Sequence, residues 1–248
     1  MPNERRMIPT KDGECTCFVF IPTNETGPWP VVIVYMDAGG IRPAMIELAQ
    51  RIADAGYVTL LPDLFYRYGS YGPFVPAEVL AGDFRSVLGP LMATTNNLKA
   101  AEDTGSLLAY LDRRSDVIAE RVGAVGFCMG GGMAIAAAGT WPDRFAAVAS
   151  FHGGRLATDD PASPHRLAAE LQAEVYVAAA QADPSYPPEM AERFEAALNQ
   201  ANLRYRAETY PAAHGWMLPD FPVFDEEQAE RGWASLADLF SRQLNRVS

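Results

Sequence analysis

The sequence predicts an α/β protein built on a mostly parallel sheet with helices on both faces. Apolar runs of strand length, such as residues 31–35 and 145–151, alternate along the chain with segments of helical length. The connections between them are mostly short, which favours strands that run parallel and pair with near neighbours. With 248 residues and 49% hydrophobic content, the chain can bury one large core, so we expect residues 1–248 to form a single domain.

Strands are predicted where short apolar runs are rich in β-branched and aromatic residues. The run at 31–35 (VVIVY) is the clearest, because an uninterrupted run is typical of a strand buried on both faces. The other strands are expected at residues 14–21, 57–61, 122–127, 145–151, 174–180 and 204–210.

Helices are predicted between these strands. Pro43 is typical of a first helical turn, and Gly56 is typical of a helix end, so a helix is expected from residue 42 to residue 55. Further helices are expected at residues 95–114, 130–139, 165–171, 187–202 and 224–244. Residues 64–92 are rich in Gly, Pro and Tyr and have no sustained period, so they are expected to form a lid or a pocket wall.

The segment Gly126-Phe127-Cys128-Met129-Gly130 follows the pattern G-x-nucleophile-x-G at a turn from strand to helix. Such a turn is tight, so its flanking positions lack side chains and its central residue is strained and exposed. The N-terminus of the following helix would stabilise a thiolate, and the N–H of Met129 would supply half of an oxyanion hole. Two alternatives remain: Cys128 is a small buried hydrophobe, or the glycines form a dinucleotide loop, although that loop requires Gly at position 128.

Cys128, Asp183 and His214 each follow the carboxyl end of a predicted strand, where open parallel sheets bind their ligands. They occur in the order nucleophile, acid, histidine, which is the order of the α/β-hydrolase fold. His214 would relay the proton of Cys128, and Asp183 would orient its imidazole. Taken singly, Asp183 also fits an Asx turn and His214 a loop histidine. His152 follows a strand at the same edge but precedes Asp183, so we expect it to line the pocket.

With these motifs, the chain resembles the dienelactone hydrolase family of cysteine-nucleophile α/β-hydrolases. The resemblance rests on residues 126–131 (GFCMGG), 61–66 (LPDLFY), 181–183 (QAD) and 210–215 (YPAAHG). It implies a carboxymethylenebutenolidase-like hydrolase that cleaves esters or enol lactones through a Cys-His-Asp triad and an acyl-thioester. It also implies a small-molecule ester or lactone as substrate, with no metal and no organic cofactor.

The chain departs from the family pattern in its pocket. Family members carry a Glu near the Cys, and Asp37 stands at that position here, where it either reaches the thiol or serves as a turn residue. The N–H of Ala38 is the candidate second oxyanion donor. The family binds a substrate carboxylate with two arginines. Arg85 is the candidate for one, whereas Trp216 stands near the place of the other and suggests a more apolar site.

Composition restricts the partners and the compartment. A net charge of −11 argues against nucleic acid or an anionic membrane as partner. No apolar run approaches membrane-spanning length, residues 1–6 lack the apolar core of a signal peptide, and three cysteines are too few for a disulfide framework. A cytoplasmic monomer or homodimer is therefore expected. Acyl transfer, cleavage of a phosphoester, and a silent small-molecule-binding homologue remain alternatives, although an intact triad argues against the last.

Overall fold

A computed structural model of the chain describes residues 4–23 and 26–244. Residues 1–3 lie outside this range. They belong to residues 1–6, in whose sequence no signal-peptide core is found. The strands are β1 (Glu4–Thr10), β2 (Gly13–Phe20), β3 (Trp29–Tyr35), β4 (Val58–Pro62), β5 (Val117–Phe127), β6 (Phe145–Phe151), β7 (Glu174–Ala180) and β8 (Tyr205–Tyr210). The helices are α1 (Pro43–Asp54), α2 (Pro76–Ala81), α3 (Phe84–Met92), α4 (Asn97–Leu111), α5 (Met129–Thr140), α6 (Pro188–Gln200) and α7 (Glu226–Gln243), with short 3-10 helices η1 (Pro142–Arg144) and η2 (Pro164–Glu170).

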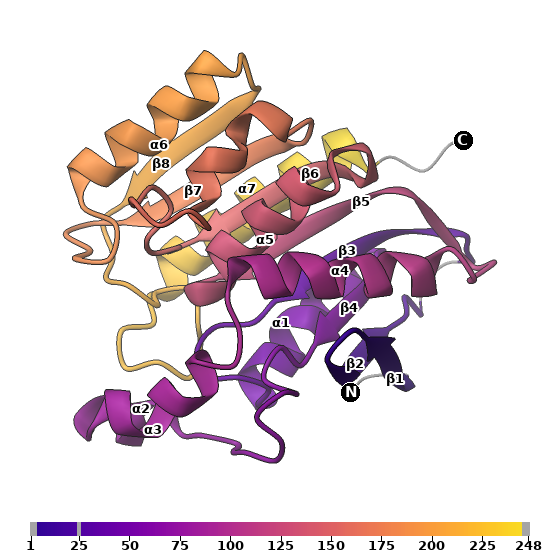
Figure 1. Cartoon of the computed structure of the whole chain (residues 1–248), viewed down its shortest axis with the longest axis horizontal. Helices are drawn as coiled ribbons and strands as arrows, with labels where there is room; N and C mark the ends of the chain where they lie inside the picture. The colour runs from indigo at the N-terminus through magenta and orange to yellow at the C-terminus, as the bar shows by residue number, and fades with distance from the viewer. Residues whose placement is uncertain (1–3, 24–25, 245–248) are drawn as a thin grey trace.

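The eight strands form one twisted sheet in the order β1-β2-β4-β3-β5-β6-β7-β8 (Figure 1). The strands from β4 across to β8 pair in parallel, whereas β1 pairs with β2 and β2 with β4 in antiparallel fashion. Helices α1 and α7 cover one face, and α4, α5 and α6 cover the other. The predicted mostly parallel sheet with helices on both faces is confirmed.

The centre of the sheet explains why the apolar runs predict its strands so well. Residues 30–35 of β3 and all residues of β6 are buried, as expected for strands covered on both faces. Helix α5 is buried over residues 130–139 because its small side chains let it lie directly on the strands. A side chain at Gly130 would collide with the backbone carbonyl of Tyr35, so this close approach requires Gly.

Two parts of the chain differ from the sequence-based prediction. Strand β1 has the polar sequence ERRMIPT and buries only Ile8, because an edge strand needs few apolar residues. Residues 64–92, expected to lack regular structure, contain α2 and α3. These helices are short, and Pro90 lies inside α3, which hides their periodicity. They extend beyond the body of the sheet (Figure 1). No described helix has both the length and the apolar character needed to cross a bilayer.

Candidate active site

Cys128 occupies a sharp turn between β5 and α5. Its backbone has φ 53° and ψ −117°, a left-handed conformation that a non-glycine residue adopts only where the surrounding structure enforces it. A side chain at Gly126 would collide with the backbone carbonyl of Gly130. The two glycines therefore allow strand and helix to approach closely, and the turn presents the Cys128 side chain at the carboxyl edge of the sheet, as the sequence pattern predicts.

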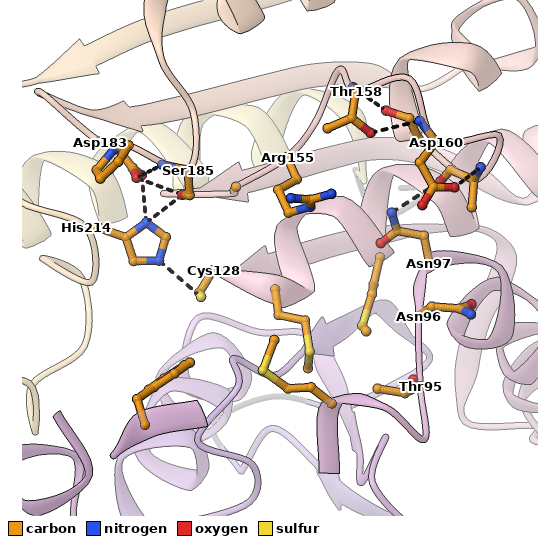
Figure 2. A pocket seen from close by; sticks show the side chains of 18 residues that line it. Thr95, Asn96, Asn97, Cys128, Arg155, Thr158, Asp160, Asp183, Ser185 and His214 are labelled. Carbon is orange, nitrogen blue, oxygen red and sulfur yellow. Dashed lines mark hydrogen bonds and ion pairs between the residues drawn. The ribbon is translucent and has the colours of Figure 1, made fainter. Parts of the chain in front are cut away.

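Cys128, His214 and Asp183 lie in a line of hydrogen-bonded side chains (Figure 2). His214 Nε2 is 3.1 Å from Cys128 Sγ, and His214 Nδ1 is 2.6 Å from Asp183 Oδ2. Asp183 follows β7 and His214 follows β8, so the carboxyl ends of three parallel strands bring these side chains together. The structure thus assembles the three residues that chain order predicts.

Ser185 supports Asp183 from the other side. Its N–H and its hydroxyl both donate to Asp183 Oδ1, at 2.8 and 2.7 Å. Asp183 therefore forms an Asx turn with one carboxylate oxygen and contacts His214 with the other, so the turn geometry and the proposed orientation of His214 are compatible. The spacing Asp183-Pro184-Ser185, typical of an Asx turn, is the signal in the sequence that could have identified Ser185.

The electrostatics of the line favour a protonated imidazole. Burial disfavours the charge on His214, but the Asp183 carboxylate and the Cys128 sulfur outweigh it and raise the pKa of His214 from 6.5 to about 10. Burial also works against the Asp183 carboxylate, yet its hydrogen bonds from His214 and Ser185 lower the pKa of Asp183 below its ordinary value. The arrangement can hold a thiol next to a group that takes up and returns its proton.

Two backbone N–H groups beside Cys128 make no hydrogen bond to any other described residue. Met129 is the first residue of α5, so its N–H has no partner within the helix. Ala38 lies in the loop after β3, where Asp37 takes the N–H groups of Gly39 and Gly40 and leaves that of Ala38 free. Ala38 and Met129 both line cavities that reach Cys128, which is the position required of the predicted oxyanion donors.

Asp37 lines a cavity that reaches the thiol, but its carboxylate is bound elsewhere. Arg42 donates to both of its oxygens, at 2.5 and 2.9 Å, and also donates to Asp220 at 2.6 and 3.1 Å. The Arg42 side chain is fully buried. Of the two interpretations left open for Asp37, the structure thus favours the turn residue. The ion pair ties the loop of Ala38 to the loop that follows His214, and no sequence motif indicated it.

His152 and Trp216, both expected to line the pocket, lie behind the hydrogen-bonded side chains of Cys128, His214 and Asp183 instead. Both are fully buried and absent from the walls of the described cavities. The Nδ1 of His152 accepts the backbone N–H of Cys128 at 3.2 Å, so His152 supports the turn from below. Trp216 stacks on Tyr210, with ring centroids 4.4 Å apart. Their burial follows from packing against β6 and β8, which the positions of these residues in loops did not reveal.

Arg85 is exposed on α3 and does not line a described cavity, so it is not where a pocket arginine was expected. Arg155 holds that position instead. It lies in the loop after β6 on the same cavity wall as Ser185 and Thr158 (Figure 2). Its guanidinium forms no ion pair with any described residue. Among the described arginines, it is the one that lines a cavity reaching Cys128.

Two cavities meet at Cys128 and His214. The mixed cavity, of about 580 Å³, carries Arg155, Asn97 and Thr158 together with three methionines. The apolar cavity, of about 440 Å³, is walled by the segment before α2, by α2 and α3, and by the loop after His214, through the residues Phe74, Val79, Leu80, Leu88, Phe221 and Val223. Within the part of the chain that the structure describes, no group of three or more His, Cys, Asp or Glu side chains is arranged to hold a metal ion.

The site geometry agrees with what comparison with known proteins finds. The model of the dienelactone hydrolase family matches residues 16–244. The chain belongs to the dienelactone hydrolase family. An Escherichia coli O157:H7 protein provisionally named carboxymethylenebutenolidase is 28% identical over 246 residues, which cover 97% of this chain and 87% of that protein.

Solved structures agree with the family assignment. A Klebsiella pneumoniae protein provisionally named a dienelactone hydrolase superposes with a TM-score of 0.84 at 25% identity, covering 96% of this chain and 98% of that one. The acylaminoacyl peptidase of Pyrococcus horikoshii has a TM-score of 0.73 at 16% identity, covering all of this chain and 42% of the peptidase, and shows the fold alone. The α/β-hydrolase fold is thus confirmed, and the chain is a hydrolase of this family.

Proposed function

We propose that this member of the dienelactone hydrolase family cleaves carboxylic esters or lactones through a Cys128–His214–Asp183 triad and an acyl-thioester intermediate. The observation that carries the proposal is the continuous line from Cys128 Sγ to His214 Nε2 at 3.1 Å and from His214 Nδ1 to Asp183 Oδ2 at 2.6 Å. A His–Asp pair of this type activates a thiol and orients its proton acceptor. The E. coli relative, named for a lactone hydrolase, supports the same reaction class.

In the first half-reaction, His214 Nε2 holds the proton of Cys128, the Cys128 thiolate attacks the carbonyl carbon, and the electron pair of the C=O bond moves onto the oxygen. The free N–H groups of Met129 and Ala38 would donate hydrogen bonds to this oxyanion. Such stabilisation of the developing charge is usually the largest single contribution to lowering the barrier of acyl transfer. As the tetrahedral intermediate collapses, the C–O bond to the alcohol breaks, and His214 Nε2 protonates the leaving oxygen. In a lactone, that oxygen stays attached to the acyl chain.

In the second half-reaction, water attacks the thioester carbon while His214 Nε2 takes one of its protons. The C–S bond then breaks, the carboxylic acid leaves, and the thiolate of Cys128 is restored beside the imidazolium. Asp183 keeps His214 in the orientation that serves both steps and stabilises its positive charge.

The test is hydrolysis of p-nitrophenyl acetate by the wild type and by Cys128→Ala, with the intact mass recorded after mixing. We expect the variant to lose at least about 10³-fold in kcat/KM while keeping its circular dichroism spectrum, because removal of the nucleophile leaves only binding and the oxyanion donors. The wild type should show one added acetyl group, and the variant none. Release of free acetate indicates hydrolysis, whereas acetylation of an added alcohol indicates acyl transfer. Full activity in Cys128→Ala would overturn the proposal.

A further inference from the structure

We infer that the apolar cavity binds a hydrocarbon substituent of the substrate, so that the enzyme selects esters with an extended alkyl group on one side of the scissile bond. The inference rests on the proposed ester hydrolysis at Cys128, since the cavity ends at the thiol and at His214. The substituent would lie under α2 and α3 and point away from the mixed cavity.

The walls of this cavity offer almost nothing to a polar group. Its side chains come from α2 and α3, from the loop after β3, and from the loop after His214, and nearly all are apolar. Apart from His214 at the end where the cavity meets the thiol, Asp37 is the charged residue of the lining, and both of its carboxylate oxygens already accept hydrogen bonds from Arg42. A carboxylate or hydroxyl placed there would lose its hydration without gaining a partner, whereas an alkyl group gains from burial.

The inner surface of the cavity forms where helices α2 and α3 pack against the loop that contains Ala38. Val79 of α2 and Leu88 of α3 form a small buried cluster with Ala38, separate from the main core, and Phe74 and Met92 pack against it. This cluster places the apolar wall directly beside the residue whose N–H is the candidate oxyanion donor. A substituent that packs against Val79 and Leu88 can therefore belong to the same substrate molecule whose carbonyl group reacts at Cys128.

The entrance is apolar as well. Leu80, Phe84 and Val223 line the cavity although 46%, 37% and 39% of their surfaces are exposed. Exposed large apolar side chains grouped at one cavity mark a binding site. The occupant must extend inward as far as Cys128, which favours a substrate over a protein partner that would cover the surface. The mixed cavity, with Arg155, Asn97 and Thr158, would receive the polar part of the molecule.

The experiment measures kcat/KM by pH-stat for two series of simple esters that lack an aromatic leaving group. In one series the acyl chain grows from methyl acetate to methyl octanoate, and in the other the alcohol grows from methyl to octyl acetate. Each methylene that enters the cavity should raise kcat/KM by up to about fourfold. We expect a rise of at least about tenfold along one series, which also identifies the side of the ester that the cavity holds.

Variants locate the effect. Val79→Phe should fill the cavity and remove the gain from chain length. Leu80→Asp changes an exposed position, so the fold should be kept. It should reduce the rise of kcat/KM with chain length, because a charge at the entrance is unfavourable next to an alkyl chain. Val87→Asp is the matched control, since Val87 lies on α3, is 38% exposed and does not line a described cavity. It should keep the wild-type chain-length profile.

A binding measurement separates this inference from the proposed function. Octanol should slow alkylation of Cys128 by iodoacetamide in the wild type and in Val87→Asp, and protect much less in Val79→Phe. Protection without ester hydrolysis would support binding of an alkyl group in the apolar cavity and overturn the proposed function, and with it the selection among esters. Hydrolysis that is independent of chain length in both series, or a gain that Val79→Phe and Leu80→Asp leave intact, would overturn the inference.

Discussion

The imidazole rings of His152 and His214 meet edge to face, with their centroids 5.2 Å apart. His152 accepts the N–H of Cys128 through Nδ1, so its proton is on Nε2. Complete burial, together with the neighbouring His214, lowers the pKa of His152 well below its ordinary value. His152 therefore stays neutral beneath the turn of Cys128, and only His214 is placed to exchange protons with the thiol.

Substitution of the two histidines should separate these functions. His214→Ala should lower kcat/KM for p-nitrophenyl acetate by about 10³-fold or more, because it removes the proton relay. His152→Ala should cost at most about tenfold in kcat/KM but destabilise the fold by about 1–3 kcal/mol, because a buried contact is lost. Steady-state kinetics and urea denaturation measure the two effects. Equal losses of kcat/KM in the two variants would contradict the assignment of the proton relay to His214.

The raised pKa of His214 predicts a pH-dependent stability. Protonation of His214 is favoured in the folded state, where its pKa rises from 6.5 to about 10, so this contribution is complete below pH 6.5 and disappears as the pH rises through about 10. Asp183→Asn removes the anion that favours the imidazolium. Each pKa unit corresponds to about 1.4 kcal/mol, so the variant should be less stable near neutral pH by a few kcal/mol and approach the wild type as the pH rises.

Urea denaturation over this pH range measures the difference between wild type and Asp183→Asn. Asp160→Asn is a suitable control, because Asp160 lines the mixed cavity without contacting His214. Its stability profile should run parallel to that of the wild type. A profile for Asp183→Asn that also runs parallel would show that the Asp183–His214 contact contributes nothing to the pH dependence of the stability.

The buried ion pair between Arg42 and Asp37 should be far more important for folding than a surface pair. Arg42→Met leaves Asp37 buried without its partner and should destabilise the protein by about 3–5 kcal/mol. Arg51→Met is the matched control, because Arg51 also makes two short hydrogen bonds to a carboxylate, Glu230, but on the surface. It should cost less than about 1 kcal/mol. Similar losses in thermal unfolding would contradict this ranking.

Two glycine substitutions test how close the packing at the turn is. Gly126→Ala forces a methyl group into the carbonyl of Gly130, so we expect a protein that is severely destabilised or does not fold. Gly89→Ala introduces the same methyl group in α3, where no atom other than those of its chain neighbours and of the helix's own backbone lies within 4 Å of it. Ala favours a helix over Gly by about 0.5–1 kcal/mol, but its Cβ is disfavoured directly before Pro90, so the two effects oppose each other and the second variant should stay within about 1 kcal/mol of the wild type. Expression yield and thermal melting compare the two.

Arg155 should govern the preference for charged substrates. Arg155→Gln should lower kcat/KM for the hemisuccinate of p-nitrophenol by about tenfold or more, because a charge-assisted hydrogen bond contributes about 1.5–3 kcal/mol. The loss for neutral p-nitrophenyl butyrate should be much smaller. Arg85→Gln is the control, since Arg85 is exposed outside the described cavities. An equal loss for both esters in Arg155→Gln would show that the guanidinium does not recognise charge.

Sequence patterns predict strands β2 to β8, the main helices between them, the Cys128 turn and the three residues of the proposed triad, but not β1, α2 or α3. These features follow from local patterns. An apolar run fixes where a buried strand ends, and glycines at positions 126 and 130 are needed wherever a strand turns directly into a packed helix. Because the carboxyl ends of parallel strands lie at one edge of the sheet, Cys128, Asp183 and His214 must meet although 86 residues separate the first from the last.

The directions in which the loop side chains point depend on packing between distant parts of the chain. Trp216 turns inward onto Tyr210, and Arg42 finds its partners at positions 37 and 220, the latter 178 residues away in the chain. Arg155, rather than Arg85, lines the cavity beside the thiol. A loop residue has no periodicity to indicate its environment, so its burial depends on what the rest of the chain packs against it. The apolar cavity exists for the same reason: α2 and α3 become its wall only where they close over the carboxyl edge of the sheet.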